Sequence, residues 1–292
     1  MSERDVPSQA HPSHDRGLEF DVATLLDRRR ALGLLGGAGL MALAGCTSDG
    51  GDGGGATTNA PPGTPSTSAS GTPTGTVTAS ASGATAEVPD ETGGPFPGNG
   101  TNGANVLDDS GIIRSDITRS IGTSTTKAEG VALTVNLTVT DSAKGYAAME
   151  GAAVYVWQCD REGRYSMYSD GVEDENYLRG VQPTNATGTA TFRTIFPAAY
   201  PGRWPHIHFQ VFRSTSEATS SGEIVKTSQL ALPDAVCRAV YATPGYEQSA
   251  TVHAETTLTS DNVFGDDGGI HQLATVTGDA TSGYIANLTI GV

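Results

Sequence analysis

The sequence AAYPGRWPHIHFQVF, residues 198–212, joins a turn to a short β-strand. In its second half His206 and His208 alternate with the apolar residues Ile207 and Phe209. Alternate residues of a strand share a face, so the two histidines project together and the apolar residues face the other way. This alternation predicts a strand that packs on a core with one side and presents two imidazoles on the other.

Similar β-branched and aromatic runs recur through the rest of the C-terminal two-thirds of the chain, separated by clusters of Gly, Asn, Asp and Pro. Such runs favour strands, and such clusters favour turns. The one modest helix candidate is DAVCRAVYA, which Pro233 and Asp234 open. We therefore predict an all-β domain, a β-sandwich of mixed strands with long loops and little helix. The strands are expected near Val131, Ala152, Thr189, His206, Leu273 and Tyr284.

Composition divides the 292 residues into three parts. Gly, Ser, Thr, Ala and Pro dominate residues 47–86, and we predict a flexible linker there because large apolar residues are too few to offset the entropy of ordering. Residues 87–292 are enough for one domain with its own core. The formal net charge of −15 argues against nucleic acid as a partner, because binding phosphates requires clustered Lys and Arg.

Residues 1–46 have the pattern of an export signal. Arg28, Arg29 and Arg30 precede the apolar run ALGLLGGAGLMALAG, which is shorter than a membrane span and ends at Cys46. The ending LAGC resembles a bacterial lipobox, and the arginines resemble a twin-arginine signal, with an ordinary Sec lipoprotein signal as the alternative. We expect an exported protein, at the cell surface or extracellular, that meets the membrane only through a lipid on Cys46.

Two further cysteines, Cys159 and Cys237, lie within the expected domain. In an exported protein they suggest a disulfide, and two independent buried thiols are the alternative. Neither has a close cysteine neighbour in sequence, so we expect no cysteine metal site.

The two histidines of the strand can bind one metal ion, because alternate Cβ atoms lie about 7 Å apart. His-x-His alone also fits two structural histidines. Tyr200 lies just upstream, whereas no Asp, Glu or Cys close by completes a familiar zinc or iron(II) site. A hard trivalent ion can instead bind phenolate, because its charge stabilises the tyrosine anion. VWQCDREGRYSMYSDG supplies a second tyrosine, Tyr165, after a Gly-containing turn, with Tyr168 as a nearby alternative.

Taken together, VWQCDREGRYSMYSDG and AAYPGRWPHIHF resemble the iron site of the intradiol ring-cleavage dioxygenases, and ETGGPFPGNG resembles the segment that opens the catalytic domain of many members. Secreted, single-chain members are the closer likeness. The resemblance implies a non-haem Fe(III) cofactor. It further implies that Tyr200 accepts a substrate proton, that Arg203 stabilises negative charge on the ring, and that Gln229 orients this region. The implied iron ligands are Tyr165, Tyr200, His206 and His208.

The implied activity is cleavage of a catechol-type ring by O₂ to a cis,cis-muconate-type product. Its partners would be a small aromatic diol and O₂. One alternative is a non-enzymatic β-sandwich module on the cell surface that binds aromatic or sugar ligands. A second is a copper or zinc enzyme that uses the His-x-His pair.

Overall fold

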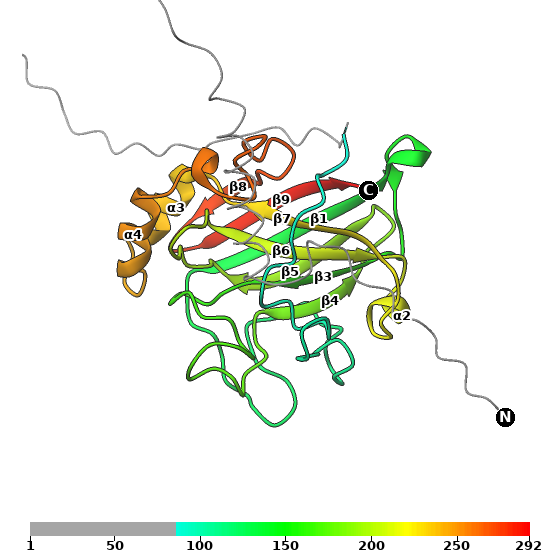
Figure 1. Cartoon of the computed structure of the whole chain (residues 1–292), viewed down its shortest axis with the longest axis horizontal. Helices are drawn as coiled ribbons and strands as arrows, with labels where there is room; N and C mark the ends of the chain where they lie inside the picture. The colour runs from blue at the N-terminus through cyan, green and yellow to red at the C-terminus, as the bar shows by residue number, and fades with distance from the viewer. Residues whose placement is uncertain (1–85) are drawn as a thin grey trace, which may run out of the picture. The chain divides into compact units, whose positions relative to one another are not determined.

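The structure of the chain, a computed structural model shown in Figure 1, describes residues 86–292. The expected export signal at residues 1–46 and all but the last residue of the expected linker at residues 47–86 lie outside the described residues. Residues 86–292 form two β-sheets and a few short helices, which confirms the prediction of an all-β sandwich. None of the helices in this part of the chain has the length and apolar character that crossing a bilayer requires.

The first sheet is mixed. Its central strand, β1 (Ala132–Asp141), pairs in parallel with β9 and antiparallel with β2 and β5. Burial alternates along most of β1, so one face packs inward and the other is partly exposed. The other strands of this sheet are β2 (Ala147–Ala148), β5 (Thr189–Ile195), β8 (Thr275–Asp279) and β9 (Gly283–Gly291).

The second sheet is antiparallel, with the strand order β4-β3-β6-β7. It contains the strand predicted at His206. Every residue of that strand is buried, so both faces of the sheet are covered. The strands are β3 (Ala153–Trp157), β4 (Arg179–Pro183), β6 (His206–Phe212) and β7 (Ile224–Ala231).

Two apolar clusters cover the two faces of the second sheet. Between the sheets, Ile207 and Phe209 of β6 meet Leu133 and Val135 of β1 in what we call the inter-sheet core. On the opposite face, a second cluster, the outer core, packs the sheet against loops. In Figure 1 the cyan and green segment before β1 crosses this face. The outer core includes Val106, Leu107, Ile112, Tyr155, Trp157, Tyr165 and Val181.

The predicted helix is present as α3 (Asp234–Tyr241), which begins directly after Pro233. The sequence did not predict α2 (Thr215–Ala218) or α4 (Glu247–Ala254). It also did not predict β4 and β7, whose Arg, Lys, Gln and Pro residues dilute the strand signal because both strands lie at a sheet edge. Two short 3₁₀ turns complete the elements of residues 86–292, at Ser142–Lys144 and Leu258–Ser260.

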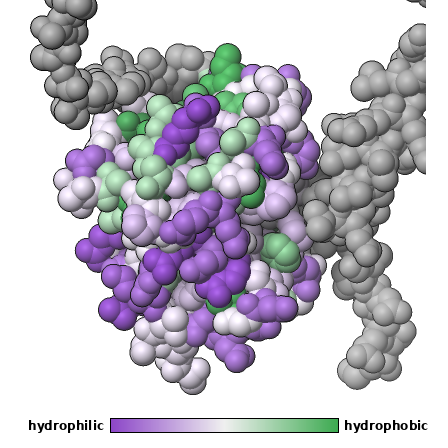
Figure 2. All heavy atoms as spheres, turned by 90° about the vertical axis from the view of Figure 1, so that its left-hand side faces the viewer, coloured by the Kyte–Doolittle hydropathy of each residue, from purple (hydrophilic) through white to green (hydrophobic). Residues whose placement is uncertain are grey.

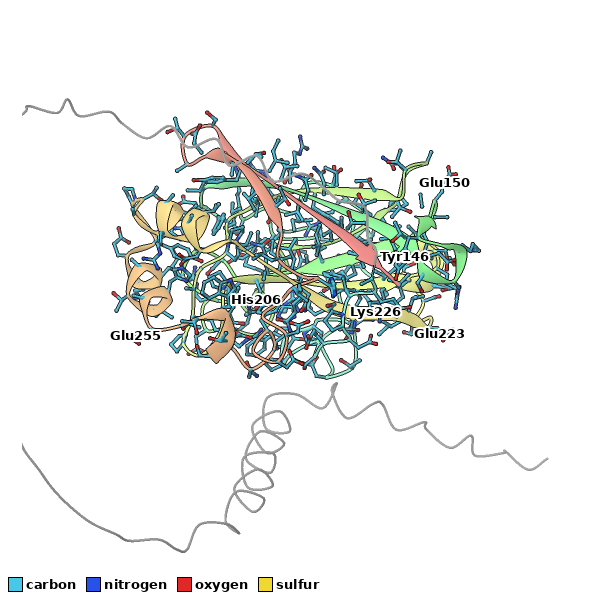
Figure 3. The ribbon with its side chains drawn as sticks, turned by 90° about the horizontal axis from the view of Figure 1, so that it is seen from above. Tyr146, Glu150, His206, Glu223, Lys226 and Glu255 are labelled. Carbon is cyan, nitrogen blue, oxygen red and sulfur yellow. The ribbon has the colours of Figure 1, made fainter. Side chains whose placement is uncertain are left out.

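The face of the domain in Figure 2 is largely hydrophilic, with apolar side chains scattered over it. The view from above in Figure 3 places His206 inside the domain and Glu150, Glu223 and Glu255 at its edges. Of the two alternatives for the cysteines, the structure has separate thiols: Cys159 and Cys237 are both buried and free.

Candidate metal centre

Four polar side chains meet beside the second sheet, on the face that carries the outer core. Tyr165 Oη lies 3.2 Å from Tyr200 Oη, and Tyr200 Oη lies 3.1 Å from His206 Nε2. His206 Nε2 in turn lies 3.1 Å from His208 Nε2. All are buried except Tyr200, which is partly exposed. The structure thus brings together the four residues that the sequence suggested as iron ligands, and we call them the donor cluster.

Strand β6 supplies both histidines from one face, as the alternation predicted. His206 Nδ1 lies 2.6 Å from the carbonyl oxygen of Trp204. We therefore place the proton on Nδ1, which leaves the Nε2 lone pair directed at the donor cluster. Within residues 86–292, His208 Nδ1 has no hydrogen-bond partner. Its ring instead stacks on Trp157, with centroids 4.8 Å apart and planes 4° apart.

A tight turn that begins at Asp160 positions Tyr165. Asp160 Oδ1 accepts hydrogen bonds from the backbone N–H groups of Glu162 and Arg164, at 3.0 and 2.9 Å. Asp side chains commonly stabilise turns in this way. Gly163 has a φ of +85°, which glycine adopts without strain. The sequence pattern pointed to the glycine but assigned no role to Asp160.

Tyr168, the alternative ligand, is engaged elsewhere. Its hydroxyl accepts a hydrogen bond from the Gly98 N–H at 2.8 Å and donates one to Asn102 Oδ1 at 2.8 Å. Tyr165 is therefore the tyrosine of this turn that faces the histidines.

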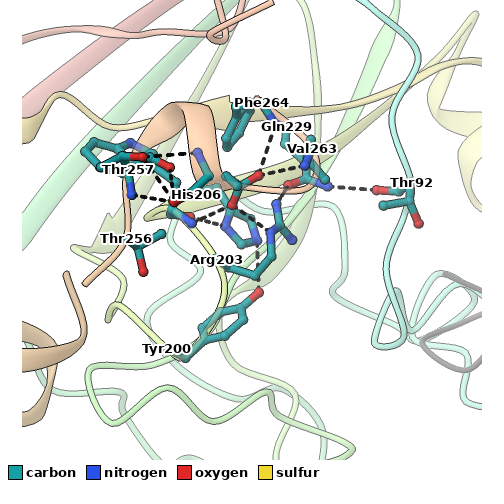
Figure 4. A network of polar contacts seen from close by, with 12 residues as sticks. Thr92, Tyr200, Arg203, His206, Gln229, Thr256, Thr257, Val263 and Phe264 are labelled. Carbon is teal, nitrogen blue, oxygen red and sulfur yellow. Dashed lines mark hydrogen bonds and ion pairs between the residues drawn. The ribbon is translucent and has the colours of Figure 1, made fainter. Parts of the chain in front are cut away.

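Arg203 and Gln229 lie beside the donor cluster and contact each other (Figure 4). Arg203 Nη2 donates to Gln229 Oε1 at 2.5 Å, and Gln229 Nε2 donates to the Thr92 carbonyl oxygen at 2.9 Å. Arg203 Nε donates to the fully buried Asp261 carboxylate at 2.9 Å. No sequence pattern pointed to Asp261, because it lies 58 positions from Arg203 in a loop without a periodic pattern.

Comparisons with known proteins show which family the chain resembles. The Dioxygenase family model matches residues 114–221, a range that contains the whole donor cluster and Arg203. The intradiol ring-cleavage dioxygenase from Tetranychus urticae is 27% identical with a TM-score of 0.52, over 63% of this chain and 87% of that one. The resemblance to the intradiol ring-cleavage dioxygenases is confirmed.

Two other solved dioxygenase structures show lower similarity. The dioxygenase domain of a carbohydrate-binding fusion protein from Streptomyces sp. SirexAA-E is 23% identical, over 71% of this chain and 98% of that one, with a TM-score of 0.42. 3-Chlorocatechol 1,2-dioxygenase from Rhodococcus opacus 1CP is 18% identical, over 60% and 62%, with a TM-score of 0.39. A search of curated protein sequences gave no match.

The donor cluster suits one metal ion in both spacing and chemistry. With metal–donor bonds of about 2.0–2.2 Å, neighbouring donors lie about 2.8–3.6 Å apart, and consecutive donors here are 3.1–3.2 Å apart. Residues 86–292 contain no group of three or more His, Cys, Asp or Glu side chains suited to a metal. Half of the donors in the cluster are phenols instead, and anionic oxygen donors match a hard ferric ion. The residues present therefore fit non-haem Fe(III).

Burial sets the protonation states of the cluster. It lowers the pKa of His206 and His208 well below the usual range, and Arg203 adds to the effect on both. The imidazoles are therefore neutral, which is the form that binds metals. Burial also raises the pKa of Tyr165 well above its usual value and that of Tyr200 to about 12. A phenolate here thus requires a nearby cation.

Glu91 lies next to this network. Burial, followed by the neighbouring Asp266, raises the pKa of Glu91 to about 8, while Gln272 and Arg203 act in the opposite direction. The sequence had identified Glu91 only as the start of the ETGGPFPGNG segment. The raised pKa of Glu91 arises from burial and contacts that form only on folding.

Proposed function

We propose that the protein is a non-haem Fe(III)-dependent dioxygenase that cleaves catechol-type rings with O₂ to cis,cis-muconate-type products. The observation that supports this function is the donor cluster itself, two phenols and two imidazoles with consecutive polar atoms no more than 3.2 Å apart. A sandwich that only bound ligands would have no need for this arrangement. In the proposed reaction the bond between the two hydroxyl-bearing carbons breaks, and each new carboxylate receives one oxygen atom of O₂.

Tyr165, Tyr200, His206 and His208 would hold the iron. Bound Fe(III) would supply the chemistry of a hard Lewis acid, which draws electron density from a catechol ring. Tyr200 contacts both another tyrosine and a histidine of the cluster and is the more accessible phenol. We assign to its oxygen, in the phenolate form that a bound cation would stabilise, the acceptance of a catechol proton.

Arg203 would stabilise the negative charge that develops on the ring. Such a role requires a cation whose position is fixed before the reaction. Asp261 holds the Nε side of the guanidinium and Gln229 holds the Nη2 side. Because Gln229 is also bonded to the Thr92 carbonyl oxygen, it connects Arg203 to the segment that opens the domain.

The first test is the visible spectrum of the protein loaded with ferric iron. We expect one iron per chain and a phenolate-to-iron band that shifts when catechol is added without oxygen; admission of O₂ should yield a muconate. Tyr165→Phe should weaken the band because one phenolate donor is lost. Tyr168→Phe is the matched control, since Tyr168 bonds to Gly98 and Asn102 rather than to the cluster.

A protein that stays colourless after ferric reconstitution and takes up no oxygen would contradict this function and favour the surface binding module. A cupric spectrum would favour the copper enzyme, and catalytic activity in a metal-loaded protein that is colourless would favour the zinc enzyme. An unchanged band in iron-loaded Tyr165→Phe would assign the phenolate to another tyrosine.

We also propose that the protein is exported and held at the cell surface by a lipid on Cys46. The basis is the arginine cluster at residues 28–30 and the apolar run that ends at Cys46. Cys46→Ser should move the protein out of the membrane fraction. If the full-length protein and this variant partition alike, the lipid anchor is wrong.

A further inference from the structure

Arg179, the first residue of β4, is a fully buried cation that forms no salt bridge within residues 86–292. A buried charge is unfavourable unless its hydrogen bonds are satisfied. The chain has 32 acidic residues, yet the partners of this guanidinium are uncharged oxygens. Its position therefore calls for an explanation other than an ion pair.

The guanidinium of Arg179 joins two segments that flank the donor cluster. Nη2 donates to the Ser166 carbonyl oxygen at 2.8 Å, and Nε donates to the Ser166 hydroxyl at 3.1 Å. Ser166 directly follows Tyr165. On the other side, Nη1 donates to the Pro97 carbonyl oxygen at 3.0 Å, in the segment that opens the domain. One side chain thus fixes the Tyr165 turn and this segment together.

The Arg179 guanidinium is also linked to His208, through neighbouring side chains on one face of the second sheet. Arg179 lies opposite Trp157 in the β3–β4 register, and Trp157 lies opposite His208 in the β3–β6 register, so the three side chains share a face. Tyr155 stacks on Trp157 with centroids 5.0 Å apart. The Tyr155 hydroxyl accepts a hydrogen bond from Arg179 Nη1 at 3.3 Å and donates to the Pro97 carbonyl oxygen at 2.7 Å.

This stack matters because, within residues 86–292, the His208 ring has a hydrogen-bond contact only at Nε2, with His206, and the Trp157 ring has none. His208 Nδ1 and Trp157 Nε1 both have no hydrogen-bond partner among residues 86–292. His206, in contrast, is fixed by the Trp204 carbonyl oxygen. The tilt of the His208 ring therefore depends on the Tyr155–Trp157 stack, whose far end contacts Arg179.

The backbone is strained on both sides of the Arg179–Ser166 contact. Leu178, directly before Arg179, has a φ of +60°, and Met167, directly after Ser166, has a φ of +73°. Bulky residues rarely adopt this conformation, and where they do the surrounding structure enforces it, often near functional sites. At Gly98, a Cβ would lie 2.8 Å from Arg179 Nη1, so a side chain there would displace the guanidinium.

We propose that Arg179 is a positioning residue for the donor cluster, which orients Tyr165 through Ser166 and His208 through Tyr155 and Trp157. The proposal rests on the proposed function in that the cluster is taken to bind iron. Its geometric part, the placement of the two rings, applies to the metal-free protein as well.

The test compares Arg179→Lys and Arg179→Gln with the wild-type protein. Lysine keeps the charge but not the planar fork that spans Ser166 and Pro97, whereas glutamine removes the charge. We expect both to reduce the near-ultraviolet circular dichroism of the metal-free protein, because the aromatic stack loosens. Both should also weaken ferric iron binding, measured by chelator competition, by about 10–100-fold, as is usual for residues that support metal ligands.

Two controls separate positioning from general destabilisation and from charge. Val135→Ala removes apolar volume from the inter-sheet core, and Arg193→Gln removes an exposed cation paired with Asp116. Neither should change the stack or the iron affinity. If an Arg179 variant fails to fold, Tyr155→Phe deletes only the hydroxyl that receives the Arg179 bond, and it should also reduce iron affinity.

The outcomes distinguish this inference from the proposed function. If the wild-type protein binds iron and the Arg179 and Tyr155 variants bind it equally well with unchanged dichroism, the positioning role is wrong. If Arg179→Lys binds iron as tightly as the wild-type protein while Arg179→Gln does not, the charge is sufficient and the positioning role is again wrong. If the wild-type protein binds no iron, the proposed function fails, and the dichroism of the metal-free variants still decides whether Arg179 orders the rings.

Discussion

Asp261 shows how much of the candidate site depends on single side chains. Its two carboxylate oxygens accept hydrogen bonds from Arg203 Nε and from the backbone N–H groups of Trp204, Val263 and Phe264, at 2.6–3.0 Å. The carboxylate is fully buried and the guanidinium is nearly so. Asp261 thus fixes Arg203, the cation proposed to act on the substrate. It also stabilises its own loop through the backbone N–H groups of Val263 and Phe264.

Asp261→Ala should lower the free energy of unfolding by about 3–5 kcal/mol, because it leaves a buried guanidinium and three backbone donors without their acceptor. Asp261→Asn keeps the volume and one oxygen acceptor and should lose less. Urea unfolding of the two variants measures the difference. A loss below about 1 kcal/mol for the alanine variant would mean that solvent replaces the carboxylate.

Glu91 should make stability depend on pH. Its pKa is raised from the ordinary value of 4.5 to about 8 in the folded protein, so between these values the folded state holds a proton that the unfolded state has released. The free energy of unfolding should therefore fall as pH rises from about 4.5 to 8, by up to about 1.4 kcal/mol per pH unit from this group. Glu91→Gln should remove that slope in urea unfolding at pH 5 to 8. If the free energy of unfolding has the same pH slope in the wild-type protein and in Glu91→Gln, another group causes the pH dependence.

At the scale of elements, residues 91–99 behave as a cover for the donor cluster, and we call them the cover segment. It is attached to β7 through Gln229 and the Thr92 carbonyl oxygen, and to Tyr155 and Arg179 through the Pro97 carbonyl oxygen. Between these attachments the backbone at Gly94 approaches the imidazole of His208 closely. The cover segment therefore forms a wall of the site and is also the first part of the domain in sequence.

Gly94→Ala should disturb the site through this approach. The added Cβ would lie 3.3 Å from His208 Cε1, at a φ of +69° that already disfavours alanine. Gly103→Ala is the matched control, because Gly103 also has a positive φ, +104°, but a Cβ added there would meet no atom within 4 Å. Both variants should lose stability, but only Gly94→Ala should weaken ferric iron binding. Equal iron affinities would show that His208 moves aside freely.

At the scale of the whole molecule, two sheets enclose the inter-sheet core while loops bury the other face of the second sheet. This packing excludes water from Cys159 and Cys237, which are both buried. The Sγ atom of each lies 3.7–3.8 Å from a backbone carbonyl oxygen. Burial raises the pKa of both thiols. The domain thus holds together without a disulfide between them.

Both thiols should be unreactive in the native protein and accessible after unfolding. Thiol titration of Cys46→Ser should give almost no reaction at pH 7 and two thiols per chain in denaturant without reductant. The midpoint of urea unfolding should be the same with and without reductant. Thiols that appear in denaturant only after reduction would establish the disulfide.

The sequence by itself determined the class of fold and the chemistry of the donor cluster. Strand alternation placed His206 and His208 on one face, because that signal is local and depends on near neighbours along the chain. The family resemblance implied Tyr165 rather than Tyr168, since only Tyr165 follows the Gly-Arg pair. The run of apolar residues in the central strands likewise predicted β3 and β6. The edge strands β4 and β7 were missed, since polar residues interrupt their apolar pattern even where those residues are buried.

Only the tertiary structure decided which distant residues support the site. Asp261 and Arg179 are ordinary charged residues in sequence, and one carboxylate among 32 acidic residues carries no local mark of its partner. Their roles arise when segments far apart in the chain are buried together, because each buried polar atom must then find a hydrogen-bond partner. Local periodicity specifies which face a side chain occupies, and long-range packing specifies what it meets there.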